Sequence, residues 1–168
     1  MQLPISTVER VGRQEAIKCV SYGVIIGYLI MSLLWSGDGW INGLRWISKV
    51  GYTGNILVGV FGMYIAAYVL GPLTAFLIVR KLHAGLTGIL FGFVILWFGI
   101  LMGCAVELYT QWLRGHTPVG EVLHDYLFKP WFWISLMGAI PVVFTGIWFG
   151  HSIKDRLNAI RISVIENK

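Results

Sequence analysis

Four long stretches without a charged residue dominate the hydrophobic pattern of this chain. They cover residues 19–35, 56–79, 86–106 and 131–149, with short connections between them. Each is close to the roughly 20 residues that an α-helix needs to cross the hydrocarbon core of a bilayer. The pattern therefore predicts an all-α integral membrane protein, a four-transmembrane-helix bundle that takes up residues 1–168 as one domain.

Shorter segments outside these stretches carry apolar residues at helical spacing. Residues 1–16, 40–50 and 119–128 are too short to cross a bilayer, and in 40–50 the charged residues Arg45 and Lys49 lie on other faces than the apolar ones. After the fourth span, apolar residues recur every three or four positions, at Ile153, Leu157, Ile160 and Val164. These segments predict short amphipathic helices at the interfaces on both faces of the membrane.

The basic residues are distributed unevenly between the two sides of such a bundle. With four spans both termini lie on one side, and nine of the 13 Lys and Arg residues fall there. Because an excess of Lys and Arg marks the cytoplasmic side, we expect an N-in, C-in topology with cytoplasmic tails at 1–18 and 150–168. We expect the membrane to be the bacterial inner membrane. No basic run exceeds two residues, so the charge pattern favours no nucleic-acid partner.

Glycines form the sharpest pattern within the spans. Five of them fall within about 60° of arc on the third span, and GxxxG pairs occur on the first and fourth spans. Small residues let helix backbones approach closely in lipid. The stripe on the third span packs the helices of one subunit or faces a second subunit, and the sequence leaves both interpretations open. The helix-packing candidates are Gly85, Gly88, Gly92, Gly99, Gly103, Gly23, Gly27, Gly146 and Gly150.

Glu107 extends the glycine stripe at the predicted outer end of the third span, and Gln111 follows it one turn later. A carboxylate at the membrane edge beside a close-packed seam is a candidate for binding a cation, carrying protons or pairing with Arg114 or Lys129. Glu107 and Gln111 are therefore the candidate ion or polar site.

Two groups of residues are weak candidates for a metal or a haem. On the outer side, His116, Glu121, His124 and Asp125 include one Glu-x-x-His spacing, but carboxylate-bridged sites in bundles use two copies. At the inner ends of spans, His83 and His151 are conceivable axial haem ligands, although no histidine lies inside a span. The sequence thus favours neither a metal nor any other cofactor.

No nucleophile turn or phosphate-binding loop is present, so we expect a protein that is not an enzyme. The leading hypothesis is an integral membrane sensor or scaffold subunit, embedded in the lipid bilayer as a homo-oligomer or within a larger membrane complex. Its cytoplasmic protein partner would dock on the tails at 1–18 and 150–168.

Two alternative functions stay open. The first is a small channel or transporter subunit that forms a pore as a homo-oligomer, with Glu107 and Gln111 as a polar ring at the mouth. The second is a redox membrane-anchor subunit that holds haem or quinone, with the histidines as ligands.

Overall fold

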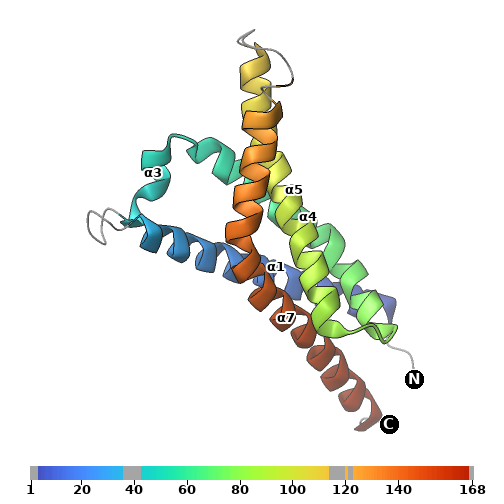
Figure 1. The fold of residues 1–168 in the computed structure, drawn as a ribbon. Coiled ribbons are helices and arrows are strands. Elements are labelled where there is room, and N and C mark those ends of the chain that lie inside the picture. Colours follow the sequence, from blue (N-terminus) through green and yellow to red (C-terminus); the bar gives the residue numbers. More distant parts are fainter. Residues whose placement is uncertain (1–3, 36–42, 114–119, 121–122, 167–168) are drawn as a thin grey trace.

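The computed structural model describes residues 4–35, 43–113, 120 and 123–166 of the chain (Figure 1). All elements in these ranges are helices, and no strand occurs among them. The elements are α1 (Ile5–Leu34), α3 (Trp46–Val50), α4 (Thr53–Val79), α5 (Ala84–Leu113), the π-helical turn η2 (His124–Phe128) and α7 (Lys129–Glu166).

Four of the helical segments are long and apolar enough to cross a membrane. They are α1, α4, α5 and the segment His124–Ser163, with a mean hydropathy of 1.8 to 2.5 over their most apolar windows. This confirms the predicted all-helical fold with four apolar helices. Figure 1 shows the ends of α1 and α7 that lead to the two termini close to the turn between α4 and α5. We call this end of the bundle the termini end.

The predicted tails are continuous with the spans. α1 runs unbroken from Ile5 through the first apolar stretch, and α7 continues without interruption from the fourth stretch to Glu166. The apolar pattern marks where lipid-compatible sequence ends, but a helix ends only where its backbone is broken. Neither tail has a proline next to its span. The two tails are therefore extensions of the spanning helices and not separate surface helices.

The other two predicted short helices are only partly within the described residues. Of the segment 40–50, the structure shows α3, which ends at Gly51 in a left-handed conformation (φ 75°) that glycine adopts without strain. Of the segment 119–128, it shows η2, which leads directly into α7. Residues 36–42, 114–119 and 121–122 lie outside the described residues.

α5 and α7 cross through glycines near the termini end. A Cβ atom at Gly88 would collide with the carbonyl oxygen of Gly146, and one at Gly150 would collide with the carbonyl of Ala84. Gly92 faces Val142, whose Cγ1 would lie 3.1 Å from an added Cβ. This crossing brings two backbones together in the way that small residues permit.

The same α5 stripe meets α4 further along. An added Cβ at Gly99 would lie 2.9 Å from the Gly59 oxygen, and one at Gly103 would lie 2.9 Å from the Asn55 oxygen. α5 is thus packed through glycine against α7 on one part of its length and against α4 on the next. In this chain the stripe makes contacts within one subunit.

A third close crossing joins α1 to α4. A Cβ at Gly71 would lie 2.6 Å from the Gly12 oxygen. The pair on the first span that the sequence singled out lies elsewhere: Gly23 has only Thr145 Oγ1 nearby, at 3.8 Å, and Gly27 has nothing within 4 Å. α1 therefore packs closely through its first half, not through its GxxxG pair.

The second half of α1 stands apart from the other long helices. Figure 1 shows its light-blue end diverging from the orange part of α7. Ile25, Leu29 and Leu33 are each more than half exposed, whereas Val8 and Val20 are buried. The main core of the described residues accordingly lies toward the termini end, where all four long helices meet.

Candidate functional site

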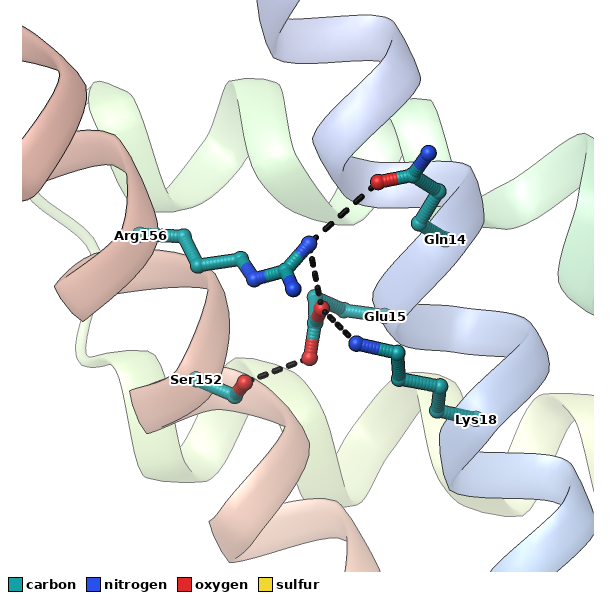
Figure 2. A network of polar contacts seen from close by, with 5 residues as sticks. All are labelled: Gln14, Glu15, Lys18, Ser152 and Arg156. Carbon is teal, nitrogen blue, oxygen red and sulfur yellow. Dashed lines mark hydrogen bonds and ion pairs between the residues drawn. The ribbon is translucent and has the colours of Figure 1, made fainter.

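A buried carboxylate joins α1 to α7 at the termini end. The side chain of Glu15 is 1% exposed. Lys18 Nζ donates a hydrogen bond to Glu15 Oε1 over 3.1 Å, and Arg156 NH1 lies 3.1 Å from the same oxygen. The Ser152 hydroxyl donates to Oε2. Figure 2 shows all of these side chains converging from the two helices, and we call Gln14, Glu15, Lys18, Ser152 and Arg156 the Glu15 cluster.

The Glu15 cluster compensates its buried charge. Both carboxylate oxygens have partners, and two cations stand against one anion. A buried carboxylate without such partners is strongly unfavourable. Arg156 NH1 also donates to Gln14 Oε1 over 3.2 Å, which orients the guanidinium between two side chains of α1. With these contacts made, the cluster is suited to holding two helices in a fixed relation and not to binding a ligand.

A neighbouring contact ties the same part of α1 to α4. The guanidinium of Arg13 lies over the ring of Tyr68, 4.5 Å from its centroid, and NH1 donates to the Tyr68 hydroxyl over 3.1 Å. One turn of α1 thus reaches α4 on one side and α7 on the other.

The Glu15 cluster was not predicted from the sequence. One signal was available: Glu15 lies at helical spacing from Val8, Val11 and Cys19, so a carboxylate interrupts the buried face of α1. A charged residue on such a face needs a partner. Its partner Ser152 is 137 positions away, and nothing in a single sequence connects the two.

The predicted polar site on α5 gains a third member from α4. Gln111 Nε2 donates to Glu107 Oε1 over 2.8 Å, and Asn55 Nδ2 donates to Glu107 Oε2 over 3.3 Å. The sequence paired Glu107 with Gln111 but did not include Asn55. Of the two cations considered for Glu107, Lys129 pairs instead with Asp125, and Arg114 lies outside the described residues.

The weak metal candidates are only partly described. His124 Nδ1 lies 3.2 Å from Asp125 Oδ1, and Lys129 Nζ lies 2.7 Å from the same oxygen, with all three side chains more than half exposed. His116 and Glu121 lie outside the described residues. Within the described ranges, no three His, Cys, Asp or Glu side chains gather as a metal site.

The two weak haem candidates have separate surroundings at the termini end. His151 Nδ1 lies 2.9 Å from the Ile147 carbonyl oxygen, and its ring lies over Gly85. Gly85, which the sequence predicted as a helix-packing residue, thus makes room for an imidazole. His83 is exposed and lines a cavity beside the α4–α5 turn.

Comparisons with protein-family models, with curated proteins and with solved structures give no match to this chain.

Proposed function

We propose that this protein is a non-enzymatic membrane sensor or scaffold subunit, oriented N-in and C-in in a bacterial inner membrane, that presents the end of α7 to a cytoplasmic protein. The observation that carries the proposal is the Glu15 cluster, which fastens α1 to the part of α7 beyond the fourth apolar stretch. A movement of either helix is therefore passed to the other.

The apolar side of the α7 extension is already covered within the chain. Ile153 and Leu157 are 0% and 5% exposed and share a core with Val8 and Val11 of α1. That face is not free for a partner. The helix instead presents a separate outward face at Asp155, Ala159 and Ile162, all of them exposed. A cytoplasmic partner would bind this outward face.

The distribution of basic residues supports the proposed N-in, C-in orientation. The basic residues of the α4–α5 turn and of both helix extensions lie at the termini end, in agreement with the positive-inside rule. The glycine crossings within the chain occupy the α5 stripe. An oligomer would therefore form through other exposed apolar surfaces, of which the second half of α1 is one.

Site-specific photo-crosslinking in cells tests the proposal. A crosslinker at Ala159 is expected to capture one recurring soluble protein, whereas a crosslinker at Ile140, which is 62% exposed on the apolar part of α7, is the matched control. Asp155→Lys is expected to weaken capture at Ala159. If Ala159 yields no protein adduct, or the same adducts as Ile140, the partner-docking proposal is wrong.

A channel or transporter subunit is the second candidate function. It is favoured by the carboxylate of Glu107, which is partly buried and contacts only amide donors among the described side chains. Ion flux into liposomes that falls with Glu107→Gln, but not with the exposed Asp125→Asn, would support a pore. Equal flux in both variants and in the wild type would remove Glu107 from any conduction path.

A further inference from the structure

A cavity of about 650 Å³ opens at the termini end of the bundle. The start of α1, the end of α4, the α4–α5 turn and the extension of α7 form its walls. Buried apolar side chains, Val8, Ile78 and Leu157 among them, line its inner part. The cavity lies where the apolar stretch 56–79 gives way to the basic turn, which is the level expected for the headgroups of a bilayer.

Basic side chains surround the apolar part of this cavity. Lys81 comes from the α4–α5 turn, and Lys154 and Arg161 come from α7, where they lie seven residues or about two helical turns apart. No carboxylate is among the described residues that line the cavity, and none of these three cations has an ion pair within the described parts of the chain. Arg156, by contrast, is engaged by Glu15. The cavity therefore combines an apolar interior with positive charge that no carboxylate of the described residues pairs with.

The backbone at Lys81 supplies an independent observation. Lys81 adopts a left-handed conformation, with φ 68°, and is the only non-glycine residue to do so in the described ranges. Its N–H donates to the Ile78 oxygen over 3.0 Å, and the N–H of Leu82 donates to the Leu77 oxygen over 3.3 Å. This pair of bonds closes a helix C-terminus where glycine is the usual residue.

A lysine at this position is strained relative to glycine. Glycine could adopt the same φ and make the same backbone hydrogen bonds. The fold therefore does not require the lysine side chain at this position. It lies at the cavity rim, where its charge adds to those of Lys154 and Arg161.

We propose that this cavity binds one anionic phospholipid from the leaflet on the termini side. Its phosphate would lie among Lys81, Lys154 and Arg161, and its glycerol and first acyl carbons would lie on the apolar wall. Exposed Val79 and Leu82 beside the cavity continue that wall toward the bilayer. A free phosphate would leave the apolar part of the cavity in contact with water, whereas a lipid covers it.

This inference uses the membrane orientation of the proposed function but not its protein partner. On α7, Lys154 and Arg161 line the cavity. The outward face at Asp155, Ala159 and Ile162 is a neighbouring but different side of the same helix. A variant of the two cations should therefore alter lipid binding and leave crosslinking from Ala159 unchanged.

Native mass spectrometry of the full chain in detergent tests the proposal. Phosphatidylglycerol is titrated against phosphatidylcholine, and inorganic phosphate is added as the competing free anion. One phosphatidylglycerol per chain is expected to bind in preference to phosphatidylcholine. Lys154→Gln with Arg161→Gln should weaken it on the order of 30-fold, about fivefold for each charge removed. The matched control is Arg45→Gln with Lys49→Gln, which removes two cations from α3 and its flank and should leave binding unchanged.

Lys81→Gly separates the role of the side chain from that of the fold. It removes the strain at the helix terminus and should raise the unfolding temperature, while it weakens phosphatidylglycerol about fivefold. Wild-type lipid affinity in either cavity variant overturns the proposal, as does equal weakening in the Arg45 and Lys49 control. Displacement of the lipid by millimolar inorganic phosphate would show that the site takes a free anion and would also overturn it.

Discussion

The two ends of the bundle are built differently. At the termini end, α1 lies against both α4 and α7, and charged side chains add to the contacts of Gly12 and Gly71. At the opposite end, α4 and α5 stay together through Gly59, Gly99 and an amide–carboxylate cluster, while α1 diverges. α1 is thus packed against the other long helices at one end, while at its other end Tyr28 contacts the segment before α4 by donating to the Leu44 oxygen and lying near the Trp46 ring.

The two ends therefore differ in which contacts hold the helices together, close packing of glycine backbones or ion pairs between side chains. Close backbone packing through glycine joins α4, α5 and α7 along much of their length, because small residues are what lipid-embedded helices use to approach each other. The ion pairs of α1 lie at the termini end, where the buried Glu15 is balanced by two cations that are themselves 45% exposed. Substitutions at the two ends should therefore differ in their effect on stability, from the largest at a glycine crossing to the smallest on the second half of α1.

Gly88→Ala should have the largest effect. The added Cβ would meet the carbonyl oxygen of Gly146, a backbone atom that cannot rotate away. We expect a loss of about 3 kcal/mol in unfolding free energy, measured by SDS titration in mixed micelles. Gly27→Ala is the control, because nothing lies within 4 Å of that position. Similar losses in the two variants would contradict the helix crossing described here.

Glu15→Ala should destabilise the termini end next. It leaves Lys18 and Arg156 without their anion, and both side chains are 45% exposed, so water offsets part of the loss. We expect about 2 kcal/mol in the same titration, below the range for a fully buried pair. Crosslinking between cysteines introduced on α1 and α7 near the cluster should fall as well. Unchanged stability would mean that the cluster does not hold these helices together.

Asn55→Ala should have a smaller effect at the opposite end. It removes one hydrogen bond of 3.3 Å to Glu107, while the bond from Gln111 remains. A loss of about 1 kcal/mol is expected from that single bond. A loss as large as that of Glu15→Ala would show that the two ends depend equally on polar contacts.

Leu29→Ala should be almost neutral. Leu29 is 54% exposed on the part of α1 that diverges from the bundle. Its effect on unfolding free energy should stay within about 0.5 kcal/mol. Leu157→Ala provides the comparison, because Leu157 is 5% exposed in the termini-end core and should cost at least about 2 kcal/mol. A large loss at Leu29 would mean that the second half of α1 is packed against a partner in the purified protein.

The sequence predicted the four apolar helices because span length and the absence of charge follow directly from the thickness of a bilayer. It also identified the stripe of glycines on α5, since their angular positions follow from helix geometry alone. Which helices meet that stripe could not be predicted, because the contacts of Gly88 with Gly146 and of Gly99 with Gly59 depend on tertiary packing.

Polar contacts within one helix could likewise be predicted from the sequence, whereas those between helices could not. Glu107 and Gln111 are one turn apart, so their hydrogen bond could be expected from spacing, whereas Asn55 lies on another helix. The ion pair between Glu15 and Arg156 was missed for the same reason. The continuity of the tails with the spans could not be predicted, because hydropathy reports the solvent that a residue prefers and not the continuity of the backbone.

The length of α7 means that a small rotation along the helix produces a larger displacement at its far end. The helix contains Pro141, which lacks the N–H for one backbone hydrogen bond, and its orange and red parts run in different directions in Figure 1. From Pro141 to Glu166 the helix extends roughly 37 Å at a rise of about 1.5 Å per residue. Because Gly146 and Gly150 hold this part of α7 against α5, a rotation of about 10° that moves the far tip by roughly 6 Å, about one helical turn, has to include α5. A small tilt shared by α5 and α7 would thereby become a larger displacement at the far end of α7.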